Sequence, residues 1–315
     1  MSELRWNPLL REWIITAVHR QDRPVLQDCP FCAGTEGVPE GVGAVAVPNR
    51  YPALTHPPPR PYIGGSSSQQ VEPSDGSCEV LVYTSSHDTA LAYLPLESVQ
   101  DIIRLWRERF LDLERRPHVK YVLIFENRGK DVGVTLSHPH GQLYAFPFTP
   151  PIIRKELESM QVHSQSGSTC LLCEIVELEL AEGGRVIATE GSLLAYVPFW
   201  ARWPYEVQIV SERHLSALDE MKEDESLALA SLLRRVLQKY DNLVDDEMPY
   251  VMVLHQRPVD GGKYSYYHFH IEIYPMRRSR TELKYLAGCE LGAGVFLNDS
   301  HPEERADELR RVAPD

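Results

Sequence analysis

Residues 137–142 of the chain read Ser-His-Pro-His-Gly-Gln. Successive side chains of a β-strand point to opposite faces, so His138, His140 and Gln142 share one face if this segment is extended. The first imidazole can then ligate a metal ion, the second can act as a nucleophile, and the amide can donate a hydrogen bond to a phosphate oxygen. The segment therefore predicts a strand that carries the active site.

The elements around this strand occur twice along the chain. Each copy has a CxxC pair, a short strand that leads to a histidine, a helix, an apolar strand and a His-x-His triplet. The first copy occupies 29–32, 79–87, 96–115, 121–127 and 138–140, and the second occupies 170–173, 206–214, 218–243, 250–256 and 268–270. Five elements that recur in order with similar gaps indicate a duplicated α+β unit. We expect the boundary between residues 150 and 168, and two domains at 1–155 and 156–315.

Each half also contains four residues of the types that bind zinc. Zinc prefers four Cys and His ligands in a tetrahedron, and a CxxC turn presents two thiolates to one ion. The histidine after the strand and the first histidine of the triplet complete each set. The sets are Cys29, Cys32, His87 and His138, and Cys170, Cys173, His214 and His268. Four protein ligands close the coordination sphere, so we expect two structural zinc ions; the alternative for each CxxC is a pair of buried thiols.

His140 follows a proposed zinc ligand by two residues, so the metal would hold its strand rigid. An imidazole that has one nitrogen held as N–H can attack phosphorus through the other nitrogen and form a phosphoramidate. The alternative is a buried histidine with structural hydrogen bonds only.

The presence of Gln142 favours the interpretation of His140 as a nucleophile and limits the class of reaction. An amide donates to phosphate oxygens but cannot protonate a leaving group. This suits a substrate with a good leaving group, such as a sugar phosphate, and transfer to a second phosphate rather than to water. In the second half Glu272 takes the place of Gln142 and would repel phosphate, so we expect His270 to be a poor nucleophile.

Other polar residues are suited to a nucleotide diphosphate. Upstream of the histidines, Asn127, Gly133 and Thr135 offer amide, backbone N–H and hydroxyl donors. Near the N-terminus, Arg20 and Arg23 either bind phosphate or ribose together or form a solvated surface pair. The segment that begins at Asn49 is either a base-binding loop or an ordinary turn.

Composition limits the classes of partner. The 315 residues carry a net charge of −13, and the isoelectric point is near 5.4. This argues against nucleic acid and anionic membrane as partners, although a local basic pocket for a phosphorylated small molecule is compatible with it. The first residues lack the apolar core of a signal peptide, and no apolar run is long enough to span a bilayer. We expect a cytoplasmic enzyme whose cysteines are thiols or metal ligands.

Taken together, these motifs resemble the galactose-1-phosphate uridylyltransferase family, a branch of the histidine-triad superfamily. The resemblance covers nearly the whole chain, and the run His-Pro-His-Gly-Gln is its most specific part. The other matching segments are Trp6-Asn-Pro-Leu, His19-Arg with Arg23-Pro, Cys29-Pro-Phe-Cys, Asn49-Arg-Tyr-Pro-Ala, Phe125-Glu-Asn, Val197-Pro-Phe-Trp-Ala-Arg-Trp-Pro, His268-Phe-His-Ile-Glu and Lys284-Tyr-Leu-Ala-Gly-Cys-Glu.

The resemblance implies two histidine-triad-like domains, with antiparallel sheets and flanking helices, in a homodimer with active sites between subunits. It implies a ping-pong reaction in which UDP-glucose transfers UMP to His140, glucose 1-phosphate leaves, and galactose 1-phosphate collects the UMP. Gln142 would bind the phosphate. Arg20, Arg23 and Asn49 would bind the nucleotide, Asn127, Gly133 and Thr135 would line the phosphates, and Lys284 and Glu290 would lie near the hexose 1-phosphate.

Some positions depart from the family and leave alternatives open. Cys289 stands where many members have a tyrosine, and a downstream glutamine is replaced near Phe296. Both differences affect the hexose preference that the resemblance implies. Some members bind their second metal with a glutamate and three histidines, a set that Glu156, His255, His268 and His270 would supply here. The rival functions are an ADP- or UDP-sugar phosphorylase with phosphate as acceptor, and a zinc-stabilised nucleotide-binding module that is not an enzyme.

Overall fold

The computed structural model describes residues 2–22, 28–35, 38–41, 43–167, 169–244 and 246–314. Its centre is a nine-stranded sheet in which every neighbouring pair is antiparallel. In sheet order the strands are β3 (Val45–Pro48), β5 (Ser77–Val82), β7 (His140–Phe146), β6 (Tyr121–Arg128), β11 (Tyr250–His255), β12 (His270–Pro275), β10 (Val207–Ser211), β9 (Leu193–Tyr196) and β8 (Val186–Glu190).

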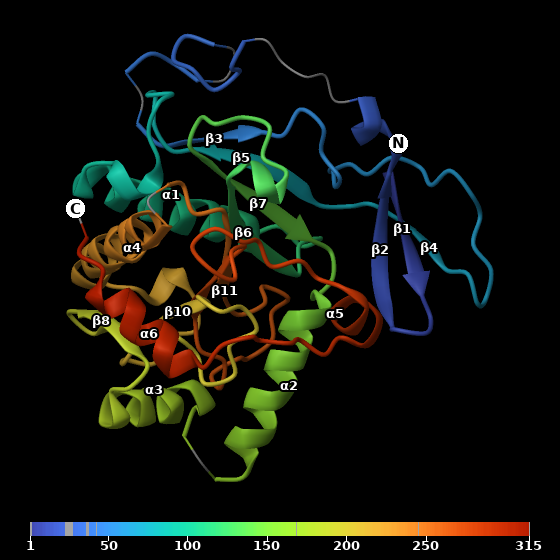
Figure 1. Ribbon diagram of the computed structural model, residues 1–315. Helices are drawn as coiled ribbons and strands as arrows, with labels where there is room; N and C mark the ends of the chain where they lie inside the picture. The colour runs from blue at the N-terminus through green and yellow to red at the C-terminus, as the bar shows by residue number, and fades with distance from the viewer. Residues whose placement is uncertain are drawn as a thin grey trace.

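The two halves of the chain join in this one sheet. Strand β6 of the first half pairs with β11 of the second, with Tyr250 opposite Arg128 and Leu254 opposite Ile124. Pairing of these two strands satisfies backbone groups that an exposed sheet edge would leave open. The histidine strands β7 and β12 lie on either side of this β6–β11 pair (Figure 1).

Helices cover both faces of the sheet. Helices α1 (Leu96–Glu114) and α4 (Glu223–Val244) pack against each other and against one face. Helices α2 (Pro151–Gln165) and α3 (Leu171–Glu182) belong to clusters on the other face. Residues alternate between the faces as a strand requires: Val122 and Ile124 join the α1 core, whereas Tyr121 joins the α2 cluster.

Helix α1 matches the predicted range 96–115 closely. It buries Val99, Ile102, Ile103, Trp106, Phe110 and Leu113, which is the spacing of one helical face. The second helix differs from its prediction, because residues Leu218–Glu220 form the separate 3-10 turn η4 and α4 begins only at Glu223. The Glu225 carboxylate accepts the Lys222 N–H at 2.8 Å, which starts the helix after this turn.

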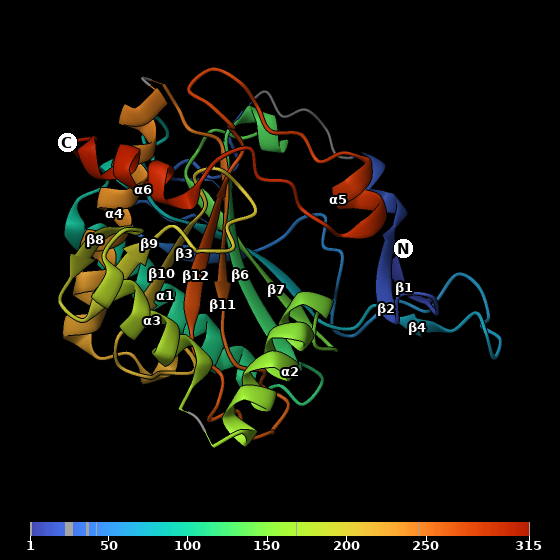
Figure 2. The same cartoon turned by 60° about the horizontal axis from the view of Figure 1, so that its bottom comes forward.

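A small second sheet stands to one side (Figure 2). Its strands are β2 (Glu12–Ala17), β1 (Ser2–Asn7) and β4 (Val71–Pro73). Leu4, Trp13 and Ile15 pack from this sheet toward Tyr144 and Phe146 of β7. The small sheet therefore connects the N-terminus to the far end of the histidine strand.

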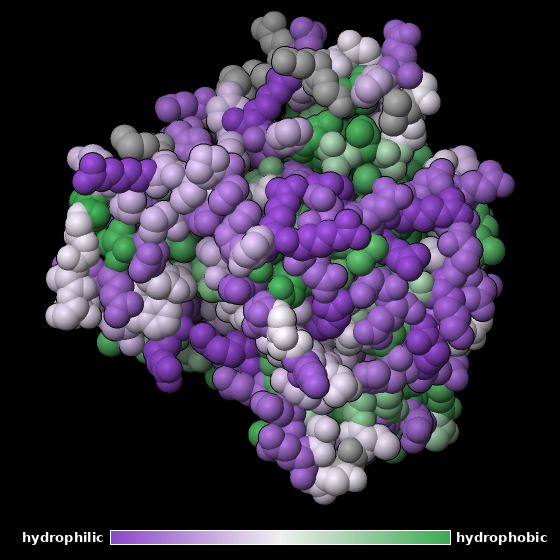
Figure 3. Space-filling model, turned by 180° about the vertical axis from the view of Figure 1, so that it is seen from behind, coloured by the Kyte–Doolittle hydropathy of each residue, from purple (hydrophilic) through white to green (hydrophobic). Residues whose placement is uncertain are grey.

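The remaining described elements are short. They are η1 (Val18–Asp22), η2 (Leu91–Tyr93), η3 (Lys130–Val132), α5 (Gly288–Ala293) and α6 (Pro302–Arg311). Seen from behind, the surface is mainly hydrophilic, and its apolar side chains form small separate areas (Figure 3). Among the described residues, none of the helices combines the length and apolarity needed to cross a bilayer.

Candidate active site and metal centres

Strand β7 presents the predicted catalytic pair on one face. His140 lies opposite Val82 of β5, and Gln142 lies opposite both Val80 of β5 and Phe125 of β6. His140 and Gln142 are partly exposed, whereas Gly141 between them is buried. The two side chains therefore project from the same side of the sheet, as the sequence predicted.

The His140 imidazole is held in a defined tautomer. Its Nδ1 lies 2.8 Å from the backbone carbonyl of His138. A carbonyl only accepts hydrogen bonds, so Nδ1 donates, and in the neutral ring the lone pair is on Nε2. Burial lowers the pKa of His140 by more than the hydrogen bond to this carbonyl raises it. The ring of Phe31 packs beside it, with centroids 5.1 Å apart. His140 is thus held as a neutral ring with its lone pair on Nε2, the form that a nucleophile requires.

Four predicted ligands of the first half converge. One atom each of Cys29, Cys32, His87 and His138 lies within 4.8 Å of the others. Cys32 Sγ is 3.6 Å from His87 Nδ1 and 3.9 Å from His138 Nδ1. Zinc bonds of about 2.0–2.3 Å place tetrahedral ligand atoms about 3.3–3.8 Å apart, so this set fits zinc. His138 Nε2 donates to the Thr84 carbonyl at 2.7 Å, which orients the ring in the manner of a metal ligand.

The second half repeats this arrangement with Cys170, Cys173, His214 and His268. Its Sγ to Nδ1 distances are 3.6 Å for Cys170–His268, 3.5 Å for Cys173–His268 and 3.7 Å for Cys173–His214. Burial opposes ionisation of Cys170, but hydrogen bonds from His214 and His268 lower the pKa of its thiol to about 5. A thiolate at this position is the form that zinc binds. Both sets of residues therefore fit closed, structural zinc sites.

His268 decides between the two ligand sets considered for the second metal. It lies in the cysteine cluster, while Glu156, His255, His270 and Glu272 form a separate group. In that group His255 Nδ1 is 2.9 Å from Glu156 Oε1. Burial opposes the charge on His255, but Glu156 raises its pKa to about 9. This separate group contains a buried ion pair and could also hold a metal ion, whereas His268 completes the Cys2His2 set.

In the second half, β12 is the counterpart of β7, and its Glu272 carboxylate is already hydrogen-bonded to other side chains. Arg202 donates to Glu272 at 3.1 Å, and Gln208 donates to the other oxygen of the same carboxylate at 2.8 Å. His270 Nδ1 is 3.0 Å from the His268 carbonyl, which reproduces the geometry of His140. The sequence pointed to Glu272 as the reason that His270 is a poor nucleophile. It did not indicate Arg202 and Gln208, which reach Glu272 from other segments.

Two predicted nucleotide residues lie at the far end of β7. Arg20 donates to the Tyr51 carbonyl at 2.8 Å and to the Tyr144 hydroxyl at 3.3 Å. Asn49 accepts the Tyr51 N–H at 2.9 Å, which is the geometry of a turn. Tyr144 is two residues beyond Gln142 on the same strand, so Arg20 and Asn49 flank the catalytic face. Arg23 lies outside the described residues.

The predicted diphosphate residues lead from β6 to β7. Asn127 pairs with Val251 near the end of β6. Gly133 ends η3 with φ of +78°, a left-handed conformation that glycine adopts without strain. Thr135 lies in the segment that continues to β7. The three residues therefore lie along the connection between the two strands, and their contact with phosphate stays a prediction.

Lys284 and Glu290, the two residues predicted near the hexose 1-phosphate, form an ion pair with each other. Lys284 Nζ is 3.9 Å from Glu290 Oε1 and donates to the Leu297 carbonyl. The Glu290 carboxylate accepts the Ala287 N–H at 3.1 Å at the start of α5. Figure 2 shows α5 on the side of the molecule that carries the small sheet.

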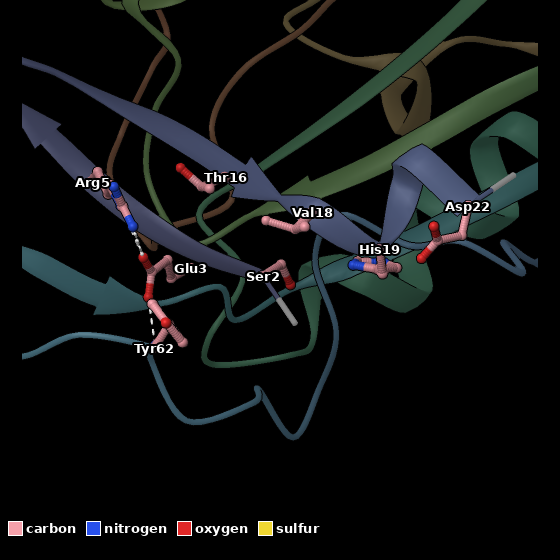
Figure 4. Close-up of a pocket in the computed structure, with 8 residues that line it drawn as sticks. All are labelled: Ser2, Glu3, Arg5, Thr16, Val18, His19, Asp22 and Tyr62. Carbon is pink, nitrogen blue, oxygen red and sulfur yellow. Dashed lines mark hydrogen bonds and ion pairs between the residues drawn. The ribbon is translucent and has the colours of Figure 1, made fainter.

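A pocket of about 400 Å³ lies on the outer face of the small sheet (Figure 4). The described residues that line it are Ser2, Glu3, Arg5, Thr16, Val18, His19, Asp22 and Tyr62. Glu3 accepts from Arg5 and from the Tyr62 N–H, so its charge is already satisfied. The lining contains neither His140 nor Gln142, and the pocket is therefore separate from the catalytic strand.

Comparisons with known proteins agree with this geometry. Residues 1–150 match the N-terminal domain of galactose-1-phosphate uridyl transferase, and residues 156–315 match its C-terminal domain. A galactose-1-phosphate uridylyltransferase from Thermotoga maritima is 43% identical over 99% of this chain and 99% of its own length. The rat galactose-1-phosphate uridylyltransferase is 30% identical over 98% of this chain and 87% of its own length.

Solved structures show the same similarity. A uridylyltransferase structure superposes with a TM-score of 0.91 at 38% identity, covering 98% of both chains. An ADP-glucose phosphorylase from Arabidopsis thaliana superposes with a TM-score of 0.77 at 25% identity, covering 99% of this chain and 100% of that one. With both halves matched and full-length relatives this similar, the chain belongs to the galactose-1-phosphate uridylyltransferase family.

Proposed function

We propose that the chain exchanges UMP between hexose 1-phosphates, converting UDP-glucose and galactose 1-phosphate to UDP-galactose and glucose 1-phosphate through a UMP–His140 intermediate. The observation that carries the mechanism is the His140 ring, whose Nδ1 donates to the His138 carbonyl. This contact leaves the lone pair on Nε2 and stabilises the positive charge that develops on the ring during attack.

In the first step Nε2 of His140 attacks the α-phosphorus of UDP-glucose. A P–N bond forms, and the P–O bond to glucose 1-phosphate breaks with its electron pair on the departing phosphate. In the second step a phosphate oxygen of galactose 1-phosphate attacks the same phosphorus, and the P–N pair returns to Nε2. The leaving group is a phosphate in the first step and the His140 imidazole in the second, so neither step needs a general acid, in agreement with the amide at Gln142.

Other residues bind and orient the substrates in this proposal. Gln142 donates to the phosphate oxygens at the point where charge accumulates. The nucleotide is held by Arg20, Arg23 and Asn49, its phosphates by Asn127, Gly133 and Thr135, and the hexose 1-phosphate by Lys284 and Glu290. The supporting observations are the positions of Arg20 and Asn49 beside β7 and the course of the chain from Asn127 to His140.

Two zinc ions complete the fold in this proposal. The first is held by Cys29, Cys32, His87 and His138, and the second by Cys170, Cys173, His214 and His268. Bound zinc would supply structural stability to both halves. His138 would thereby fix the chain two residues before the nucleophile.

We also infer a cytoplasmic homodimer with domains at 1–155 and 156–315. Exposed apolar side chains near α5 support an interface between two copies; Tyr285 and Leu291 are 75% and 74% exposed. The family matches to 1–150 and 156–315 support the domain limits.

One second function is favoured by a specific observation, the structural similarity to an ADP-glucose phosphorylase. That reading uses inorganic phosphate as the acceptor. The test is a steady-state comparison of galactose 1-phosphate with phosphate as acceptors for UDP-glucose and for ADP-glucose. We expect parallel double-reciprocal lines with galactose 1-phosphate and UDP-glucose, and loss of exchange in a folded His140→Gly variant. Faster turnover of ADP-glucose with phosphate would assign the chain to the phosphorylases.

A further inference from the structure

Gly141 separates the nucleophile from Gln142 and faces the buried side of β7. A Cβ at this position would lie 2.2 Å from Tyr83 Oη, 2.9 Å from Tyr83 Cζ and 3.2 Å from the Phe125 carbonyl oxygen. The Tyr83 phenol thus packs directly against the backbone of Gly141, on the side of the sheet opposite His140. A glycine inside a strand often marks such a close approach.

The backbone of Tyr83 holds the same segment from its edge. Its N–H donates to the Pro139 carbonyl at 3.1 Å. The carbonyl of the next residue, Thr84, accepts from His138 Nε2 at 2.7 Å. Residues 83 and 84 therefore contact the histidine strand before, at and after Pro139.

The phenol itself is fixed in the core. Tyr83 is 1% exposed, and its ring meets Trp106 edge to face with centroids 6.2 Å apart. Burial raises its pKa well above the ordinary value, and the facing carboxyl of Glu126 raises it further. The hydroxyl is neutral at physiological pH, and among the described residues it has no hydrogen-bond partner.

Glu126 stands behind the phenol on β6. It is 5% exposed and accepts from Tyr250 Oη at 2.7 Å. Burial raises the pKa of Glu126 to about 7, although the hydrogen bond from Tyr250 and the charge of Arg128 favour its ionised form. Arg128 is itself neutralised by Asp241 through contacts of 2.8 and 2.9 Å. The group behind Tyr83 is thus a largely desolvated carboxyl rather than a solvated charge.

We propose that Tyr83 is a positioning residue for uridylyl transfer, because its phenol packs against Gly141 and sets the position of β7 perpendicular to the sheet. The inference rests on the proposed role of His140 as nucleophile. The strand ladders with β5 and β6 fix β7 within the plane of the sheet. The Tyr83 phenol fixes β7 in the direction perpendicular to that plane. A displacement of β7 in this direction would move His140 and Gln142 together relative to the phosphorus. Misplacement by about 1 Å can cost about 100-fold in rate.

The test is a pair of single variants and their double variant. The readout is the single-turnover rate of protein uridylylation at saturating UDP-glucose, with the KM for UDP-glucose measured alongside. Tyr83→Phe removes the hydroxyl, and we expect the rate to fall about tenfold with KM within about twofold. Gly141→Ala pushes β7 away from the phenol, and we expect a fall of about 100-fold.

The double variant decides the proposal. Removal of the hydroxyl eliminates the 2.2 Å contact with the new methyl group and leaves the milder 2.9 Å contact with the ring. Tyr83→Phe should therefore partly restore the rate in the Gly141→Ala background, although it lowers the rate in the natural chain. Merely structural damage would instead accumulate, and a double variant slower than Gly141→Ala alone would overturn the proposal.

Tyr121→Phe is the matched control. Tyr121 is a residue of β6 and is also fully buried, but it belongs to the α2 cluster. We expect it to change thermal stability about as much as Tyr83→Phe without changing the uridylylation rate. An equal fall in rate for both would also overturn the proposal. Failure of the proposed function is separately visible, because the natural chain would then acquire no UMP that depends on His140.

Discussion

Changing Gln142 to glutamate tests the proposal that the first half is catalytic and that Glu272 makes the second half inactive. The two side chains are nearly isosteric, and β7 is held by backbone pairing with β5 and β6, so the strand should persist. Residues two apart on a strand are about 7 Å apart, which allows the end of residue 142 to reach a phosphate bound to His140. The carboxylate would then face a negative charge about 4 Å away. At an effective dielectric constant of about 20, this repulsion is about 4 kcal/mol, or about 1,000-fold in rate.

The assay is rapid-quench measurement of uridylylation with labelled UDP-glucose. Gln142→Met is the matched control, because it removes the amide donor without adding charge. We expect Gln142→Glu to be much slower than Gln142→Met, while both variants keep their thermal stability and metal content. If the two variants react within a factor of three of each other, the charge argument is refuted, and with it the explanation of why Glu272 disables the second half.

The remaining predictions concern the metal sites, the nucleophile and the buried ion pair. Cys173→Ser should reduce bound zinc from two ions per chain to one and lower the melting temperature; unchanged zinc content by elemental analysis would show that these cysteines are only buried thiols. Because burial lowers the pKa of His140 below 6.5, the uridylylation rate should stay constant from pH 8 to pH 7 and fall only in more acidic solution; a fall that begins above pH 7 would contradict the neutral-imidazole geometry. Glu156 raises the pKa of buried His255 from 6.5 to about 9, so their pair contributes about 3 kcal/mol that is present below pH 6.5 and is lost as the pH rises through about 9. His255→Gln should therefore cost about 3 kcal/mol in urea unfolding at pH 6 and clearly less at pH 9.5, and an equal cost at both pH values would rule out the ion pair.

The repeated residue types made the two Cys/His clusters and the shared face of His140 and Gln142 predictable. Cys and His residues at these spacings are typical of metal ligands. Their recurrence in two similar halves indicates which of them lie close together. Strand alternation then placed His140 and Gln142 on one side of β7. The Cys170–Cys173 pair favoured the assignment of His268 to the cysteines over the set with Glu156, and the structure groups it with them.

Features that depend on contacts between distant segments were not predictable. Nothing in the side-chain pattern of β6 or β11 shows that these strands pair and merge both halves into one sheet, since backbone hydrogen bonds are common to all residues. Likewise, Arg202 reaches Glu272 across 70 residues of chain. The break between η4 and α4 depends on contacts of Glu225 with Lys222 and Arg213. Gly141 did carry a signal, because a glycine within a strand suggests close approach by another group, but the sequence could not identify Tyr83 as that group.

The most direct test of the account is an intact-mass spectrum after incubation with UDP-glucose, quenched under alkaline conditions that preserve a phosphoramidate. The account predicts a gain of one uridylyl group per chain in the natural protein and none in a folded His140→Gly variant. A gain that survives in His140→Gly, or no gain at all in an active natural protein, would contradict covalent transfer through His140.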